Sequence, residues 1–425
     1  MLADLFSRST PGIKLGLEGT EGLLEALDHP ERGVCNILVA GTNGKGSTSF
    51  MLAQGLTACG LRTGLFTSPH LLRFTERMRI DGVEATPDTI VRLHHRLVQA
   101  EARAGIRGTF FESATVLSAL AFAEAEVDVA VYEVGLGGRL DATNAISHDL
   151  VLITPISFDH TNVLGNTLGV IAGEKARTIS RGGTAVVAPQ PREVRAVIEE
   201  LARQRQARIV NAYDVAEETD AGFVLRGSAP QAPLAISPPA RLPSFQRRNL
   251  GTVAAACAVL QDAGYEGVSP ARAVAHAAGC QWPGRFHWLS GQHSPIVLDG
   301  AHNPGGIETL WEALDDDPRS QRKPRHTVFT ALRGKDGGAM GKRVGEGSQS
   351  VSLCPVSSAR SRRGAELAAL VPGAAVHEDF AAALRYARTR ALQDAGIVVV
   401  TGSLFLVGDA LAHLTSALRD PPVDG

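Results

Sequence analysis

The chain has 425 residues, of which 44% are hydrophobic and 20% are charged, so it is long enough for two or three domains with large cores. Its net charge of −2 excludes a strong overall attraction to nucleic acid or to a membrane surface. The five cysteines are scattered and form no CxxC spacing, which argues against a disulfide framework or a zinc ribbon and favours the reducing cytoplasm. Nothing in the composition requires assembly, so we expect a monomer.

Neither the N-terminus nor the longest apolar stretch has the pattern of a targeting or membrane segment. The N-terminal stretch MLADLFSRSTPGIKLG lacks the basic start and long apolar core of a signal peptide. The longest apolar stretch, Ile397 to Leu414, is interrupted by polar residues and is too polar to cross a bilayer. We predict a strand, a loop and a helix there.

The first chemically informative segment is Asn36–Ser47, NILVAGTNGKGS. The apolar run Ile37–Ala40 predicts a buried strand, and Thr48–Cys59 has the pattern of a helix. A glycine-rich turn between a strand and a helix directs backbone N–H groups and the helix N-terminus at a phosphate. Lys45 is placed to reach phosphate oxygens and the Ser47 hydroxyl to reach Mg²⁺. The alternative interpretation is a turn that only connects the two elements.

Strands and helices alternate after this loop. Strands are predicted at 127–134, 150–154, 185–188 and 207–210, which indicates a mainly parallel sheet with helices on both faces. Ligands of such sheets bind beyond the carboxyl ends of the strands. Ser228–Pro243 is rich in Pro, Ala and Ser and predicts loops and short edge strands, and 249–263 predicts a helix.

A second alternation follows the segment Trp282–Arg285, where Pro-Gly ends the preceding helical region. We predict a P-loop domain at 1–281, a linker at 282–288 and a smaller α/β domain at 289–425. Its predicted strands are 295–298, 327–331, 350–353 and 396–401, and its predicted helices are 305–314, 364–370 and 380–393. The glycine-rich segment Arg333–Gln349 is interpreted as either a mobile loop or a degenerate helix.

Glu133 begins the motif EVGLGGRLDATN at the carboxyl end of a predicted strand. Apolar residues flank it on both sides, so a purely solvated role does not fit. A carboxylate at this edge of the sheet, near the P-loop Ser47, is a natural Mg²⁺ ligand. The alternative is a buried glutamate with a structural partner.

His160 and Lys175 are weaker candidates when taken singly. His160 follows the next strand in the sequence Asp159-His160-Thr161, where it is placed to bind a second metal or a substrate group, or to act as a hydrogen-bonded loop histidine. Lys175 lies on a predicted helix and by itself reads as a surface lysine. Because Mg²⁺ repels an ammonium group, a metal-site role for Lys175 requires a chemical change such as carbamylation.

The second domain opens with Val297–Pro304, VLDGAHNP, again polar groups between a strand and a helix. The alternative is an ordinary strand-to-helix turn. Arg285 lies just upstream, and an arginine that reaches across a domain gap can hold phosphate as a planar fork. Two polar surfaces that face one another across a hinge suggest closure over ATP and a second substrate.

Together these motifs resemble the folylpolyglutamate synthase/dihydrofolate synthase family, within the wider group of Mur-type amide ligases. The resemblance covers nearly the whole chain. The matching motifs are GTNGKGS at 41–47, TSPHLLRFTERMRIDG at 67–82, EVGLGGRLDATN at 133–144, DHTNVLG at 159–165, GEK at 173–175, WPGR at 282–285, LDGAHNP at 298–304 and TGSLFLVGD at 401–409.

The resemblance implies an α/β fold with a P-loop-containing, mostly parallel, Mur-ligase-like domain and a smaller Rossmann-like C-terminal domain. It implies ATP and two Mg²⁺ ions, with Ser47, Glu133, His160 and a carbamylated Lys175 as metal ligands. The implied catalytic residues are Lys45, His160, Lys175 and His302. The implied ATP-binding residues are Thr42, Asn43, Gly44, Lys45, Gly46, Ser47, Thr48, Gln246, Asn249, Arg285, Asp299 and Asn303. The implied folate-binding residues are Ser68, Pro69, His70, Phe74 and Arg77, in a segment that the residues alone would describe as a solvated basic loop.

The implied reaction joins L-glutamate to dihydropteroate or to a reduced folate, without nucleic acid or membrane partners. ATP would convert the acceptor carboxylate to an acyl phosphate, which the glutamate amine then attacks, so the protein mainly positions groups and neutralises charge. Two alternatives remain: a Mur-type ligase that uses a different acceptor, and a nucleotide-binding module without ligase activity. The sequence does not decide whether the first glutamate, later glutamates or both are added.

Overall fold

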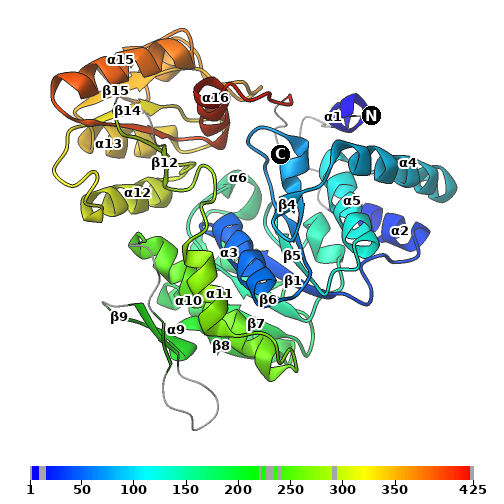
Figure 1. Cartoon of the computed structure of the whole chain (residues 1–425). Coiled ribbons are helices and arrows are strands. Elements are labelled where there is room, and N and C mark those ends of the chain that lie inside the picture. Colours follow the sequence, from blue (N-terminus) through cyan, green and yellow to red (C-terminus); the bar gives the residue numbers. More distant parts are fainter. Residues whose placement is uncertain are drawn as a thin grey trace.

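The computed structural model describes residues 2–8, 16–219, 222–225, 234–236, 242–289 and 294–421. The chain forms two α/β domains, with the C-terminal domain above the larger N-terminal domain in the view of Figure 1. Both sheets are mostly parallel, which confirms the predicted fold class.

The N-terminal domain is built on an eight-stranded sheet of order β4-β3-β2-β5-β1-β6-β7-β8. The six strands from β2 to β8 in this order are parallel, and β3 and β4 add an antiparallel edge. The strands are β1 Cys35–Ala40, β2 Thr63–Phe66, β3 Met78–Ile80, β4 Val83–Glu84, β5 Val129–Glu133, β6 Leu150–Ile153, β7 Thr184–Val187 and β8 Arg208–Asn211.

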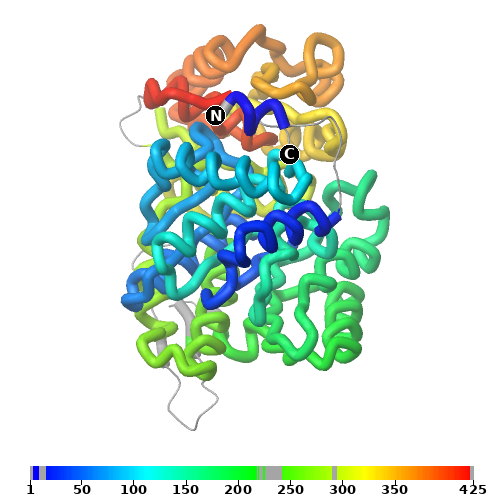
Figure 2. Tube along the Cα trace, turned by 90° about the vertical axis from the view of Figure 1, so that its right-hand side faces the viewer, coloured from blue at the N-terminus to red at the C-terminus, as the bar shows by residue number. Residues whose placement is uncertain are grey.

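Helices cover both faces of this sheet, so its central strands are apolar along their whole length. In β1, Ile37 and Val39 pack on one face, and Leu38 and Ala40 pack on the other. The first face carries α3 Lys45–Ala58, α10 Ser244–Asp262 and α11 Pro270–Ala278. The second carries α2 Glu18–Ala26, α4 Pro87–Ala104, α5 Phe110–Glu124, α7 Leu168–Ala176 and α8 Arg192–Gln204. Figure 2 shows α2, α4 and α5 side by side on this second face.

Shorter elements complete the domain. They are α1 Leu2–Ser7, the 3₁₀ helices η1 Phe74–Arg77 and η2 Ala142–Ala145, α6 Thr161–Leu164 and α9 Ala212–Val215. A small antiparallel sheet contains β9 Ala216–Thr219, β10 Gly222–Leu225 and β11 Leu234–Ile236. Strand β11 falls within 228–243, where short edge strands were predicted, but most of that segment lies outside the described residues.

The C-terminal domain has a six-stranded sheet of order β12-β13-β17-β14-β15-β16, in which only β12 is antiparallel to its neighbour. The strands are β12 His287–Leu289, β13 Ile296–Leu298, β14 Arg325–Phe329, β15 Ser350–Leu353, β16 Ala375–Val376 and β17 Ile397–Thr401. One face packs on α15 Phe380–Gln393 and α16 Leu404–Thr415. The other packs on α12 Pro304–Asp316, α13 Gly337–Glu346 and α14 Ala365–Ala368.

Several predicted elements needed refinement. Helix α10 begins at Ser244, five residues before the predicted start at 249. Helix α13 lies within the glycine-rich segment 333–349, so that segment contains a helix and is not a mobile loop. Strand β12 begins at His287, inside the predicted linker 282–288. The domain boundaries at 281 and 289 therefore stay a prediction. Among the described residues, no helix is long and apolar enough to cross a membrane.

Candidate functional site

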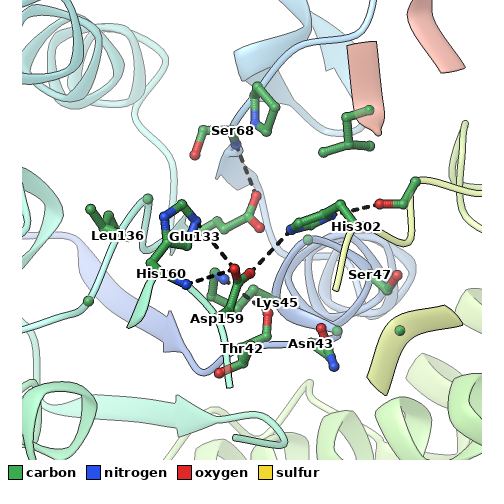
Figure 3. A pocket seen from close by; sticks show the side chains of 18 of the residues that line it. Thr42, Asn43, Lys45, Ser47, Ser68, Glu133, Leu136, Asp159, His160 and His302 are labelled. Carbon is green, nitrogen blue, oxygen red and sulfur yellow. Dashed lines mark hydrogen bonds and ion pairs between the residues drawn. The ribbon is translucent and has the colours of Figure 1, made fainter. Parts of the chain in front are cut away.

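A cavity of about 520 Å³ lies between the two domains, beyond the carboxyl ends of β1 and β5 (Figure 3). Both domains contribute to its lining, as expected for a site at the carboxyl ends of parallel strands. Most of the sequence-predicted site residues line it: Thr42, Asn43, Gly44, Lys45, Gly46, Ser47, Ser68, Pro69, Arg77, Glu133, His160, Lys175, Asn249, Arg285, Asp299 and His302. Thr48, His70, Phe74, Gln246 and Asn303 are not part of the lining.

The glycine-rich loop ends at Gly44, which precedes the first turn of α3 with a left-handed φ of 87°. Among the described residues, no side chain caps this helix N-terminus. Its first N–H groups are therefore available to an anion, with the helix dipole in support. The Lys45 ammonium donates to the carbonyl oxygens of Gly41 and Thr42 at 3.3 and 3.2 Å, which holds the charge over the loop.

The neighbouring loop after β6 fixes the shape of the glycine-rich loop. The backbone N–H groups of Thr42 and Asn43 both donate to the Pro155 carbonyl, at 3.0 and 3.1 Å. The Thr42 hydroxyl donates to the Ser157 carbonyl at 3.1 Å. These two residues thus maintain the loop rather than offer their own N–H groups to a ligand. Thr48 is fully buried inside α3.

Glu133 stands at the end of β5, buried beside the glycine-rich loop. Its carboxylate accepts the Ser68 N–H at 2.9 Å, as Figure 3 shows. A Cβ atom at Gly46 would lie 3.2 Å from the Glu133 Oε1 atom, so glycine allows this close approach. Burial raises the pKa of Glu133, and the charge of Lys45 opposes that rise. A cation at this carboxylate would relieve the cost of burying it.

Lys175 projects from α7 toward the same loop and is buried. Its ammonium donates to the Gly41 carbonyl at 2.7 Å. Burial, and then the charge of Lys45, lower the pKa of Lys175 to about 7. Near neutral pH a large fraction of this side chain is therefore a free amine, the form that reacts with CO₂.

Asp159 forms the centre of a charged cluster that joins the domains (Figure 3). It accepts a hydrogen bond from the Lys335 ammonium at 2.5 Å, and His302 Nε2 lies 3.5 Å from its carboxylate. The Lys335 ammonium also lies 3.0 Å from His160 Nε2. Both members of the Asp159–Lys335 pair are buried, with side-chain exposures of 10% and 8%.

Burial and the charges of this cluster shift the pKa values of its members. Burial alone would raise the pKa of Asp159, but His302 and Lys335 override it and hold that pKa well below its usual range. Burial and then the Lys335 charge lower the pKa of His160 to about 3, so this imidazole is neutral. Burial lowers the pKa of Lys335, against the pull of Asp159.

Amide side chains make a second connection between the domains. Asn303 precedes α12, where its Oδ1 atom accepts the Gly306 N–H at 2.7 Å. Its Nδ2 atom donates to Asn43 of the glycine-rich loop at 2.9 Å. In the N-terminal domain, the Asn249 side chain donates to Gln246 at 3.1 Å and lies against Gly44. Gln246 and Asn303 thus support the rim through residues that line the cavity.

The contacts of Asp299 are with backbone groups of its own domain. Its carboxylate accepts the N–H groups of Phe286 and Ala301, each at 2.8 Å. These bonds fix the turn that carries Arg285 into the cavity wall. Burial raises the pKa of Asp299, and the charge of Arg285 opposes the rise.

The cavity wall also contains the aromatic rings of Phe110 and Phe111, near Arg77. The buried Arg77 guanidinium lies 5.0 Å from the centre of the Phe110 ring and donates to His70 Nδ1 at 2.9 Å. The Phe74 ring packs edge-on against Phe110, with 5.8 Å between ring centres. His70 therefore holds the Arg77 guanidinium directly, and Phe74 packs on the Phe110 ring that faces it, while Ser68, Pro69 and Arg77 reach the cavity.

Sequence reasoning left part of the cavity lining without an assigned role, including Phe110, Phe111, Asp159 and Lys335. The start of α5 had a detectable signal, since Thr109 and Glu112 form a capping box. That signal places Phe110 and Phe111 in the first turn of a helix but does not direct them to a ligand. Asp159 lies in the motif DHTNVLG and Lys335 in the glycine-rich segment, and only the packing of the domains brings them together.

Metal ligands of the protein alone are few. Within the described residues, no group of three His, Cys, Asp or Glu side chains is placed to hold a metal ion. The Ser47 hydroxyl and the Glu133 carboxylate are nevertheless hard oxygen ligands of the kind Mg²⁺ takes together with substrate phosphates and water.

Comparison with known proteins first defines the class. Residues 284–404 match the family model described as "Mur ligase, glutamate ligase domain". This match covers the C-terminal domain and places that domain in the class of Mur-type ligases.

Comparison with whole proteins narrows the family. The chain is 31% identical to the dihydrofolate synthase/folylpolyglutamate synthase of Bacillus subtilis, over 95% of this chain and 96% of that protein. It is 33% identical to a probable bifunctional folylpolyglutamate synthase/dihydropteroate synthase of Halobacterium salinarum, over 97% of this chain but only 51% of that longer protein. The chain belongs to the folylpolyglutamate synthase/dihydrofolate synthase family.

Solved structures agree with this membership. A Mycobacterium tuberculosis folylpolyglutamate synthase complexed with ADP and AMPPCP superposes with a TM-score of 0.85 at 28% identity, covering 99% of this chain and 98% of that one. A bifunctional folylpolyglutamate synthase/dihydrofolate synthase with Mn, AMPPNP and L-glutamate bound gives a TM-score of 0.83 at 30% identity, covering 97% and 98%.

Proposed function

We propose that this chain is an ATP-dependent ligase that joins L-glutamate by an amide bond to the carboxylate of dihydropteroate or of a reduced folate. The observation that carries the proposal is one cavity that holds a phosphate loop, aromatic rings in its wall and a cluster of cations from the second domain. A nucleotide, a pterin-bearing acid and an amino acid have these three complementary chemistries. The relatives named above supply the substrate identities.

The P-loop domain binds the ATP phosphates through the N-terminus of α3 and Lys45. Asn249, which lies against Gly44, and Arg285 border the nucleotide from the sides. The γ-phosphoryl group passes to the acceptor carboxylate, which becomes an acyl phosphate as ADP leaves. Such a transfer requires alignment and charge neutralisation rather than a protein nucleophile.

Ser47 and Glu133 would hold a Mg²⁺ ion, which neutralises phosphate charge when it is bound. We further propose a second ion, held by His160 and a carbamylated Lys175. The neutral His160 imidazole and the lowered pKa of Lys175, about 7, support this assignment. A carbamate would replace the lysine cation by an anion.

The acceptor lies between the aromatic rings of Phe110 and Phe111 and the loop that carries Ser68 and Arg77. L-Glutamate enters from the C-terminal side, where His302 and Lys335 present polar and cationic groups. Its amine attacks the acyl carbonyl, and phosphate leaves. The Asp159–Lys335 and Asn43–Asn303 contacts hold the two domains together over the cavity, which protects the acyl phosphate from water.

The test is substrate-dependent turnover of the purified protein. ADP and phosphate should appear only when L-glutamate and a dihydropteroate or folate acceptor are both present, and mass spectrometry should find the acceptor extended by glutamate. Parallel reactions with dihydropteroate and with tetrahydrofolate separate first addition from later additions. Ligation of an amino acid to a UDP-linked muramyl acceptor, with neither pterin accepted, would refute the proposal.

We also propose that the enzyme acts as a cytoplasmic monomer with domains at 1–281 and 289–425. The five cysteines carry free thiols in the structure, which supports a reducing compartment. Size-exclusion chromatography with light scattering tests the assembly state directly.

A further inference from the structure

The segment Ser68–Arg77, here called the acceptor loop, belongs to the N-terminal domain by sequence but contacts both domains. At one end, its Ser68 N–H binds Glu133 beside the glycine-rich loop. In the middle, Leu71 is 8% exposed and belongs to the hydrophobic core of the C-terminal domain, together with Val407. The loop therefore spans the gap between the domains.

The segment Ser416–Pro421, here called the strap, leaves helix α16 and crosses to the acceptor loop. Asp420 makes two hydrogen bonds with the loop: its carboxylate accepts the Phe74 N–H, and its N–H donates to the Leu72 carbonyl, both at 2.7 Å. Arg419 donates to the Leu71 carbonyl at 3.1 Å. Backbone groups at three loop positions are thus held by two strap residues.

The strap is anchored in the C-terminal domain. The Arg419 guanidinium forms an ion pair with Asp409 of α16 and donates to the Phe405 carbonyl at 3.4 Å. Gly408 makes this approach possible, since a Cβ atom there would lie 2.6 Å from the Leu71 carbonyl oxygen. These contacts fasten the acceptor loop to α16.

The acceptor loop is cross-linked by internal hydrogen bonds. The Glu76 carboxylate accepts the N–H groups of Leu71, Leu72 and Arg73, at 2.8, 3.0 and 2.9 Å. These bonds tie the strap contacts to η1, which ends at Arg77 in the cavity wall. The Glu76 hydrogen bonds and η1 thus connect the strap contacts to Arg77.

We propose that Arg419 and Asp420 are positioning residues that make the acceptor loop move with the C-terminal domain, so that the acceptor site is complete only when the domains are closed. The inference rests on the proposed function, because that function assigns the loop to the acceptor. It gives a route by which ligands in the nucleotide and glutamate sites improve acceptor binding without touching the acceptor.

The experiment compares Asp420→Ala and Arg419→Ala with the wild type in steady-state kinetics and in amide hydrogen exchange. We expect the KM for the acceptor to rise about tenfold, while the KM values for ATP and L-glutamate change less than twofold. Asp420→Asn keeps an oxygen that can accept the Phe74 N–H and should restore most of the acceptor KM. Leu418→Ala is the matched control, because Leu418 is 88% exposed and lies in the same strap.

Hydrogen exchange separates this inference from the proposed function. In wild type, a non-hydrolysable ATP analogue with L-glutamate should slow exchange across residues 71–77, and in Asp420→Ala this protection should disappear. Equal protection in both proteins, or an unchanged acceptor KM in Asp420→Ala, would overturn the inference. If the wild type ligates no folate-type acceptor, the proposed function fails, and the exchange comparison still decides whether the strap couples the domains.

Discussion

Breaking the ion pair between Asp159 and Lys335 should impair ligation far more than breaking an ordinary surface ion pair would. The two groups are 2.5 Å apart, and their side chains are only 10% and 8% exposed. With an effective dielectric constant of about 20, their attraction is about 7 kcal/mol, most of which offsets the cost of burying both charges. Lys335→Met leaves the Asp159 carboxylate buried in the cleft without its cation, and the closed arrangement loses its central contact.

We expect a net penalty of about 2–3 kcal/mol for Lys335→Met and a similar penalty for Asp159→Asn, within the range of about 1.5–7 kcal/mol for close charge pairs. At about 1.4 kcal/mol per factor of ten, this corresponds to a roughly 30- to 150-fold loss in kcat/KM for L-glutamate. The assay is ADP release at saturating ATP and acceptor. Because each single variant strands one charge, the double variant should be no worse than either single variant.

The outcome that refutes this reasoning is a double variant whose loss equals the product of the two single losses. Independent effects would mean that Asp159 and Lys335 do not act through their pair. Arg333→Met provides the control, because Arg333 lies two residues away and forms an exposed ion pair with Glu366. Exposed pairs contribute little, so kcat/KM should stay within twofold of wild type.

Three further variants test the phosphate loop and its neighbours. Lys45→Ala should reduce turnover at least about 100-fold. The melting temperature should change little, because the ammonium binds only loop carbonyls in the described structure. Retention of full activity would remove Lys45 from the mechanism. Gly44→Ala should destabilise the protein by about 1–2 kcal/mol and raise the KM for ATP. The reasons are that the φ angle of Gly44 is 87° and that the new methyl group would lie 2.7 Å from Asn249. An unchanged melting temperature would contradict this prediction. The pKa of Lys175 is depressed to about 7 from an ordinary 10.5, so the unfolded chain holds this proton more tightly and wild-type stability rises with pH between those values. Relative to Lys175→Met in CO₂-free buffer, the wild type should gain about 2 kcal/mol between about pH 7 and pH 9, and parallel pH profiles would refute it.

The sheet strands were predictable because burial on both faces makes them continuous apolar runs. The predicted strands at 127–134 and 150–154 contain β5 and β6, and the polar residues after them lie at the cavity as expected. The buried parallel strand β2 was not predicted, because its four residues TGLF form too short an apolar run, and the strands β3 and β4 were not predicted either. Strands β3 and β4 have three and two residues, which is too short for a period of two to be recognised.

The candidate site was predictable where local sequence carries the chemistry, as in the glycine-rich loop and Glu133. It was not predictable where two distant segments meet. Asp159 and Lys335 are 176 positions apart, and Lys335 lies in a glycine-rich segment with no clear helical signal. Each residue alone resembles an ordinary loop residue, and only the packing of the two domains creates the pair.

The burial of Leu71 in the core of the opposite domain has a consequence for the exchange of domains between related enzymes. A hybrid joined at the turn Trp282–Arg285 would bring Leu71 from one parent and its pocket around Val407 from the other. The C-terminal domain and the acceptor loop should therefore be exchanged together, although roughly 200 residues of chain separate them. Hybrids that keep this pair from one parent should remain soluble and active more often than those that split it.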